Sequence, residues 1–126
     1  MWPYNHEVDP PAPFLDVVIL HPHTPDQMRR VTAKLDTGAD LSAIPQAIAD
    51  ELGLLPVRTI TAESFDGSRT SIDTYAVTLE IAPARFRHIE VILIPDEYAL
   101  LGRDILNHFY AELNGPALTF DLRLEP

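Results

Sequence analysis

The sequence predicts a mainly β domain that closes its sheet and carries two short helices. Most of the chain divides into short stretches in which apolar or β-branched residues alternate with polar ones, a spacing typical of strands. Turn residues such as Pro and Gly separate these stretches. The chain has 126 residues, the length of one domain, and 46% of them are hydrophobic, which allows a real core. Many short strands with few helices favour a sheet that closes on itself, because closure removes exposed edges.

The expected strands follow one another at residues 14–20, 29–36, 41–44, 57–63, 69–81, 88–94, 110–113 and 117–122. A first helix is expected over residues 45–53, since Pro45 suits the first helical position and Gly53 suits a C-terminal cap. A second helix of about two turns is expected over residues 104–109. Hairpin signals, Asp-Gly at residues 66–67 and Asn-Gly at residues 114–115, join neighbouring strands.

The chain divides into three segments. Residues 1–13 contain four prolines and are expected to form an extended, proline-rich N-terminal arm, because proline suits neither a helix interior nor a central strand. Residues 14–122 carry the alternating pattern and form the domain. Residues 123–126 are a short C-terminal tail.

Charge and cysteine content narrow the classes of function. Nine Lys and Arg residues stand against nineteen Asp and Glu residues, which gives a formal net charge of −10. Nucleic-acid binding needs a basic surface, so this charge argues against it and against anionic membranes. The absence of cysteine excludes disulfides and thiolate chemistry. No apolar run reaches membrane-spanning length and the first residues do not resemble a signal peptide, so we expect a cytoplasmic protein with peptide or protein partners.

Two histidines, His21 and His23, lie one residue apart in the expected turn at residues 21–27. Two imidazoles so close invite a metal site. No third ligand lies nearby in the sequence, so we interpret this segment as a solvated turn and expect no metal or other cofactor.

The most informative stretch, residues 33–40, joins an alternating strand to a tight turn. Asp36 supplies a carboxylate at the end of the strand. Thr37 has a hydroxyl that can brace a neighbouring backbone, and Gly38 allows a ligand or a second backbone to approach closely. Asp, Thr and Gly are also common in ordinary turns, so the triplet needs support from elsewhere in the chain.

Residues 99–106 supply that support, with two aliphatic residues, a Gly and the start of a helical pattern. The order and spacing of Asp36-Thr37-Gly38 and Leu101-Gly102 resemble those of the retropepsin-like aspartic proteases, which include the single-domain retroviral proteases. The resemblance extends over about residues 14–122. Two-lobed relatives carry two such triplets and this chain carries one, so the resemblance implies a homodimer with the site on its two-fold axis.

The resemblance implies an aspartic endopeptidase in which the Asp36 carboxylates of two subunits hold one water between them. One carboxylate accepts a proton as the water attacks the peptide carbonyl, and the other later returns a proton to the leaving nitrogen. Two carboxylates about 3 Å apart, as in aspartic proteases generally, share one proton and titrate as a pair. The resemblance implies no metal or cofactor for this step.

The residues around Asp36 have supporting roles by the same resemblance. Thr37 would brace the active-site loop and Gly38 would admit the peptide backbone. Asp40 and Arg103 would form a charge-assisted link that ties the loop to the helix behind it. The whole supporting set is Thr37, Gly38, Ala39, Asp40, Leu101, Gly102 and Arg103.

The hairpin tip at Phe65, Asp66 and Gly67 lies between the two motifs, where the family carries the flap that closes over a bound peptide. The alternative is an ordinary surface hairpin, and this tip is less glycine-rich than a retroviral flap. Retroviral relatives dimerise by interleaving their termini, and the proline-rich arm suits that role badly. The alternating residues Leu118, Phe120, Leu122 and Leu124 could instead pair across a two-fold axis.

Two functions from different classes are therefore retained. The leading hypothesis is an aspartic endopeptidase that acts as a homodimer. The alternative is a dimeric peptide-binding module of the same fold with weak or no catalysis. Asp36 favours the first, because a pure binding module has no chemical need for this carboxylate. The N-terminal arm could also occupy the cleft of an inactive precursor.

Overall fold

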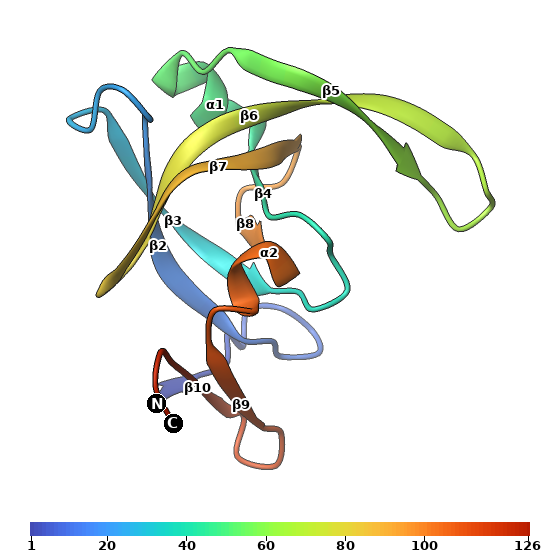
Figure 1. Ribbon diagram of the computed structural model, residues 1–126. Helices are drawn as coiled ribbons and strands as arrows, with labels where there is room; N and C mark the ends of the chain where they lie inside the picture. Colours follow the sequence, from blue (N-terminus) through green and yellow to red (C-terminus); the bar gives the residue numbers. More distant parts are fainter.

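The computed structural model describes residues 1–126 and consists mainly of strands (Figure 1). The strands are β1 (Trp2–Pro3), β2 (Phe14–Leu20), β3 (Met28–Leu35), β4 (Ala43–Pro45), β5 (Pro56–Glu63), β6 (Arg69–Ile81), β7 (Ala84–Ile94), β8 (Ala99–Leu101), β9 (Tyr110–Asn114) and β10 (Thr119–Arg123). The helices are α1 (Gln46–Leu52) and α2 (Arg103–Leu106). A mainly β fold with two short helices is thus confirmed. Neither helix is long and apolar enough to cross a membrane.

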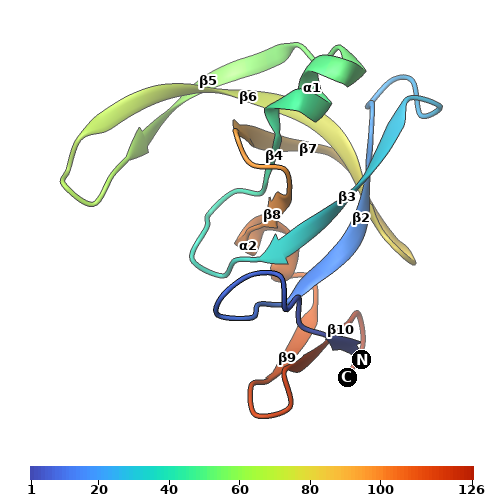
Figure 2. The same cartoon turned by 180° about the vertical axis from the view of Figure 1, so that it is seen from behind.

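Six of the strands close into one sheet, in the order β2-β3-β8-β4-β7-β6, and β6 pairs back onto β2 (Figures 1 and 2). The closing contact is antiparallel, with Ile19 opposite Leu79. Two pairings are parallel, β3 with β8 and β4 with β7. β5 lies outside the closure as an edge strand paired only with β6. The prediction of a closed sheet is confirmed, and its interior is the core of the domain.

Alternation along the strands explains the core. On β2, Val17 and Ile19 are buried, whereas Asp16, which precedes Val17, is exposed. Val77 on β6 and Val91 on β7 are buried in the same core cluster. Each such aliphatic side chain contributes about 1.5–3 kcal/mol when it leaves water. The core therefore fixes the positions of the strand ends that carry the site.

Helix α1 begins one residue later than the sequence predicts. Pro45 belongs to β4 and has an extended ψ of 134°, so it precedes the helix rather than opening it. Gly53 ends the helix with a left-handed φ of 65°, and its N–H bonds the carbonyl of Asp50 at 3.1 Å. The prediction for Gly53 is confirmed.

Two other boundaries differ from the prediction. β7 begins at Ala84 rather than at residue 88, because the pairing with β6 shifts register between Val77 and Leu79 and His88 adopts a φ of 54° at that irregularity. This bulge interrupts the alternation, so the sequence pattern shows only the later part of the strand. α2 ends at Leu106 rather than at residue 109, since the N–H groups of His108 and Phe109 bond carbonyls three residues back in a tighter turn.

A second, three-stranded sheet has the order β1-β10-β9 and contains both ends of the chain. The first residues of the arm are therefore anchored in the same chain, with Trp2 opposite Phe120 and their side-chain rings 5.5 Å apart. β10 has a neighbour on each side, and Phe120 and Leu122 are buried in the core. β1 reaches only Thr119 and Phe120 of β10, so the expected pairing of these alternating residues with another subunit stays a prediction.

Candidate active site

Parallel pairing of β3 with β8 places the two sequence motifs side by side. Leu35 is opposite Leu101 in this pair, so Asp36 and Gly102 follow at neighbouring strand ends. The Asp36 N–H donates to the Leu101 carbonyl at 2.9 Å, and the Leu35 N–H donates to the Pro13 carbonyl at 3.1 Å. Asp36 is thus held at its backbone by segments on both sides.

The turn after Asp36 is folded around its own carboxylate. The Gly38 N–H donates to Asp36 Oδ1 at 3.0 Å, and the Ala39 N–H donates to the Asp36 carbonyl at 3.2 Å. A Cβ on Gly38 would lie 3.3 Å from Asp36 Oδ1, a tight approach. The side chain of Asp36 is half-buried and that of Thr37 is exposed. Glycine therefore leaves room beside the carboxylate.

Gly102 packs directly against the backbone of the same loop. A Cβ at this position would lie 2.8 Å from the carbonyl carbon of Leu41 and 2.9 Å from the carbonyl oxygen of Ala39. Real side chains do not approach backbone so closely, so any larger residue would displace the loop. The segment after β8 thus supports the active-site loop from behind.

Arg103 connects both ends of this loop to α2. Its Nη1 donates to the Thr37 carbonyl at 2.7 Å, its Nη2 forms an ion pair with Asp40, and its backbone N–H donates to the Ala39 carbonyl at 2.9 Å. The guanidinium is 45% exposed and the Asp40 side chain 85%, so solvent screening keeps the energy of this ion pair small. Its effect is geometric, since a planar fork fixes the direction of the turn.

The structure adds two residues that sequence reasoning missed, Ser42 and Asp104. The buried Ser42 hydroxyl donates to Asp104 Oδ1 at 2.8 Å and accepts the Gly102 N–H at 3.0 Å. The Ser42 N–H donates to Asp104 Oδ2 at 3.1 Å, and Asp104 Oδ1 accepts the Ile105 N–H at 2.9 Å. A polar residue inside the apolar run at residues 41–44 was the available signal.

A groove of about 660 Å³ opens beside the active-site loop. One wall is the loop itself, residues 38–41, and the other is the edge strand β5 at residues 60–63. The apolar side chains of Ile72 and Ile92 complete the lining. Asp40 and Glu63 contribute carboxylates to the two walls. The groove therefore combines an apolar lining with a carboxylate on the loop and another on β5.

The hairpin tip between β5 and β6 lies outside this groove lining. Phe65 at the tip is fully exposed, and Gly67 has a left-handed φ of 82° that suits the turn. Hydrogen bonds from Ser68 lower the pKa of the Asp66 carboxyl below its ordinary value. The hairpin arches out on the side of the loop between β3 and β4 (Figures 1 and 2). The predicted flap residues are thus present at a hairpin tip but apart from the other site residues.

The histidine pair of the first turn has a local structural role. His21 Nδ1 accepts the backbone N–H groups of His23 and Thr24 at 3.1 and 3.2 Å. The ring of His23 also lies 5.6 Å from that of His88. No group of three or more His, Cys, Asp or Glu residues in the chain is arranged to hold a metal ion.

Several solved structures share this fold. The solution structure of simian foamy virus (mac) protease is 21% identical, with a TM-score of 0.56 over 75% of this chain and 92% of that one. EIAV protease, complexed with the inhibitor HBY-793, is 23% identical, with a TM-score of 0.56 over 82% and 90%. A retropepsin-like aspartic protease from Rickettsia conorii is 17% identical, with a TM-score of 0.57 over 90% and 82%. The expected retropepsin-like fold is confirmed.

Comparison of the sequence with protein-family models identifies the family. No curated protein matches the chain. The family model described as gag-polyprotein putative aspartyl protease matches residues 27–108, well over half of the chain. This range contains Asp36, the loop that follows it and the supporting segment at Gly102. The chain belongs to the gag-polyprotein putative aspartyl protease family.

Proposed function

We propose that this protein is an aspartic endopeptidase whose catalytic pair consists of Asp36 from each of two identical subunits. The observation that carries the proposal is the position of Asp36, fixed between the Leu101 carbonyl and its own turn, just before the loop residues 38–41 that line a groove. Family membership supports the same assignment. One chain supplies one such carboxylate, so a second copy completes the pair.

The reaction needs no covalent intermediate. One Asp36 carboxylate accepts a proton from the water that attacks the scissile carbonyl, while the protonated partner carboxyl donates a hydrogen bond to the carbonyl oxygen. The nitrogen of the breaking peptide bond then receives a proton and leaves. The groups around Asp36 hold its carboxylate in place, since Gly38 donates to Oδ1 and Arg103 holds the Thr37 carbonyl.

The groove supports a preference for extended peptides with hydrophobic side chains. β5 is an edge strand, so its outer backbone groups are available to pair with a substrate strand. Ile60, Ile72 and Ile92 offer apolar contacts within the groove. Asp40 and Glu63, within a chain of net charge −10, disfavour acidic peptides and favour neutral or basic ones.

The test is cleavage of a mixed peptide library at mildly acidic pH over a range of protein concentrations. We expect activity to rise more steeply than linearly with concentration, because active dimers form from inactive monomers. Asp36→Asn should abolish cleavage and leave fold and dimer intact. Asp50→Asn on the exposed face of α1 is the matched control and should retain activity.

Two results would overturn the proposal. Cleavage by Asp36→Asn at the parent rate would remove the assigned carboxylate from the mechanism. Peptide binding without turnover, from a folded dimer at every concentration, would establish the peptide-binding module instead. A precursor form is distinguished from both, because cleavage would then begin after the first thirteen residues are removed.

A further inference from the structure

A small polar cavity lies at the seam where β2 pairs with β6 and β6 pairs with β7. Its volume is about 40 Å³. A water molecule needs about 10–15 Å³ of such space, so the cavity admits only a few non-hydrogen atoms. Of its eight lining residues, five have side chains that can donate a hydrogen bond: His21, Thr78, Arg85, Arg87 and His88. None of the eight is acidic, in a chain with nineteen Asp and Glu residues.

A β-bulge brings two of these side chains to the same place. Across the bulge, β6 advances by two residues and β7 by three. Arg87 and His88 therefore share the position opposite Thr78, and the φ of 54° at His88 belongs to this irregularity. Bulges commonly turn a side chain in a new direction. Thr78 is itself opposite Leu20, the last residue of β2, so the turn that follows β2 begins beside the bulge.

The turn after β2 contributes His21, one of whose ring nitrogens is already used. His21 Nδ1 accepts the backbone N–H groups of His23 and Thr24 at 3.1 and 3.2 Å. An accepting Nδ1 places the ring proton on Nε2, so Nε2 remains as a donor. The His23 ring lies 6.1 Å from that of His21 and 5.6 Å from that of His88. Three of the five histidines in the chain thus gather at this turn and the bulge.

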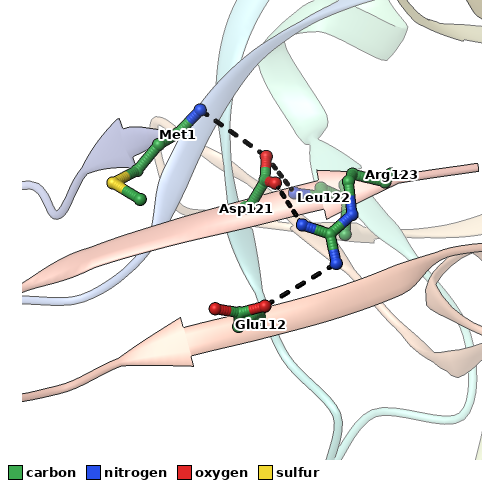
Figure 3. A network of polar contacts seen from close by, with 5 residues as sticks. All are labelled: Met1, Glu112, Asp121, Leu122 and Arg123. Atoms are coloured by element: carbon green, nitrogen blue, oxygen red, sulfur yellow. Dashed lines mark hydrogen bonds and ion pairs between the residues drawn. The ribbon is translucent and has the colours of Figure 1, made fainter. Parts of the chain in front are cut away.

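Most arginines of the chain are paired with a carboxylate, and Arg87 is not. Figure 3 shows one paired example, Arg123, which lies 2.7 Å from Asp121 and 3.6 Å from Glu112. The other arginines in ion pairs are Arg29, Arg58, Arg85 and Arg103. Arg87 is exposed, lines the cavity and makes no ion pair. Its positive charge is therefore available to a ligand.

Arg85 adds a second guanidinium, whose charge is partly compensated. Its Nε and Nη2 both bond Glu80 Oε2, at 3.1 and 2.5 Å, which leaves Nη1 for another acceptor. The net charge of −10 repels anions from the molecule as a whole, so an anion binds here only through local donors. The cavity offers donors of three kinds, namely guanidinium, imidazole and hydroxyl.

We propose that this cavity binds a single small oxyanion of the phosphate class. Arg87 supplies an unpaired positive charge, and the His21 Nε2–H and the Thr78 hydroxyl supply further donors. Hydrogen bonds from a guanidinium to an oxyanion are among the stronger ones, because both groups are charged. The bound anion links the turn after β2 to the bulge of β7. The small volume favours free inorganic phosphate over a phosphoryl group on a larger partner.

The first experiment is an NMR titration with sodium phosphate at constant pH, beside sodium chloride at matched ionic strength. Salt screens exposed charges, so the chloride series removes that general effect. We expect saturable shifts of the backbone amide signals at residues 21–24, 78 and 85–88 in phosphate alone. Equal shifts in the two salts would overturn the proposal.

Arg87→Gln tests the charge, because glutamine keeps a polar side chain and removes the guanidinium. The dissociation constant for phosphate should rise by about tenfold, since a charge-assisted hydrogen bond is lost. Arg69→Gln is the matched control. Arg69 is also exposed and makes no ion pair, but it lies outside the cavity, so this variant should bind phosphate like the parent. Equal losses of affinity in the two variants, or none in Arg87→Gln, would contradict the proposed site.

Two further variants test the geometry of the cavity. His88→Asn removes the imidazole, and asparagine tolerates the left-handed φ at this position. Thr78→Val removes the hydroxyl and keeps the shape of the side chain. Each should weaken phosphate binding by about threefold, as expected for one neutral hydrogen bond. Parental affinity in both variants would exclude the cavity and leave only a surface arginine.

A short peptide that carries one phosphoserine distinguishes the source of the anion in the same titration. Equal or weaker binding of this peptide supports free phosphate, and binding about tenfold tighter would overturn that assignment in favour of a phosphorylated partner. The cavity shares no residue with the groove beside the active-site loop, and the turn between β2 and β3 lies well apart from the loop between β3 and β4 (Figures 1 and 2). Arg87→Gln should therefore cleave peptides like the parent, so the phosphate site and the peptidase function are tested separately.

Discussion

The active-site loop at residues 36–42 and strand β9 differ in how many contacts within one chain hold them in place. Bonds from β8 and α2 hold the loop at several points, including the Asp36 N–H, the Thr37 carbonyl and the Ser42 hydroxyl. β9 has a partner on one edge and none on its faces. The loop is thus ordered by contacts within one chain, whereas β9 keeps an unpaired edge and exposed side chains.

The strongest test of the loop is Gly102→Ala. The new Cβ would meet backbone atoms of Leu41 and Ala39 at 2.8–2.9 Å, so the loop must move. We expect the free energy of unfolding to fall by about 2–3 kcal/mol, as for other overpacked sites. Peptide cleavage should be lost, because the displaced loop carries Asp36. Denaturant unfolding and cleavage of a peptide library measure the two effects.

Gly115→Ala is the matched control for this substitution. No atom lies within 4 Å of the Cβ it would add, and the residue sits in the open turn between β9 and β10. Its stability should change by less than about 0.5 kcal/mol. If Gly102→Ala proves as stable as Gly115→Ala, the loop is not supported by close backbone contact.

A smaller effect is expected from Ser42→Ala. Removing the hydroxyl leaves the buried Gly102 N–H without an acceptor and takes one donor from Asp104. An unsatisfied buried group of this kind costs about 1–2 kcal/mol in unfolding free energy. Thermal unfolding measures the loss. Ser71→Ala, at an exposed position of β6, should be nearly neutral, and equal effects of both changes would refute the network's role.

Arg103→Lys tests whether Arg103 acts by orienting the active-site loop rather than by stabilising the fold. Lysine keeps the charge but cannot hold the Thr37 carbonyl and Asp40 together with a planar fork. The ion pair is largely exposed, so we expect a stability loss below about 1 kcal/mol. We expect a large fall in kcat despite the small loss of stability, because the loop that presents Asp36 is no longer held in one orientation. Arg29→Lys changes a similar exposed pair with Glu51 that includes no residue of the loop, and it should leave kcat unchanged.

Much of this arrangement could be predicted from the sequence. Alternation gave the strands of the closed sheet, and the φ of 65° at Gly53 agrees with its predicted cap. The contact between Asp40 and Arg103, 63 residues apart, was expected only through the resemblance, since nothing local connects them. Its role in catalysis stays a prediction. The approach of the Asp36 turn to Gly102 follows from parallel pairing of β3 with β8.

The features that escaped prediction depend on long-range placement. Ser42 and Asp104 are ordinary polar residues until the crossing of loop and α2 brings them together. The Asn-Gly signal predicted the hairpin of β9 and β10, but it could not show that β9 would be the free edge. That outcome is decided by Trp2 and Pro3, which pair with β10 although proline-rich segments are usually poor strands.

The β5–β6 hairpin also combines a part held by several contacts with a part that is exposed. Its tip at Phe65 is fully exposed, whereas its base is tied to β7 through Glu90. The Thr74 hydroxyl donates to Glu90 Oε1 at 2.7 Å, and Arg58 Nε donates to the same oxygen at 2.5 Å. The hydrogen bond from Thr74, followed by that from Arg58, lowers the pKa of Glu90 below its ordinary value.

Thr74→Val should therefore raise the pKa of Glu90 toward the ordinary glutamate value of 4.5, because it removes the hydroxyl donor and keeps the shape of the side chain. A carboxyl whose pKa is lowered by folding stabilises the protein above its unfolded value, and this stabilisation is lost as pH falls through the lower folded value. The stability difference between parent and variant should thus be largest near neutral pH and shrink in acid. NMR titration of the Glu90 carboxyl, with unfolding at several pH values, measures both. An unchanged titration of Glu90 in Thr74→Val would mean that Arg58 alone holds the base of the hairpin.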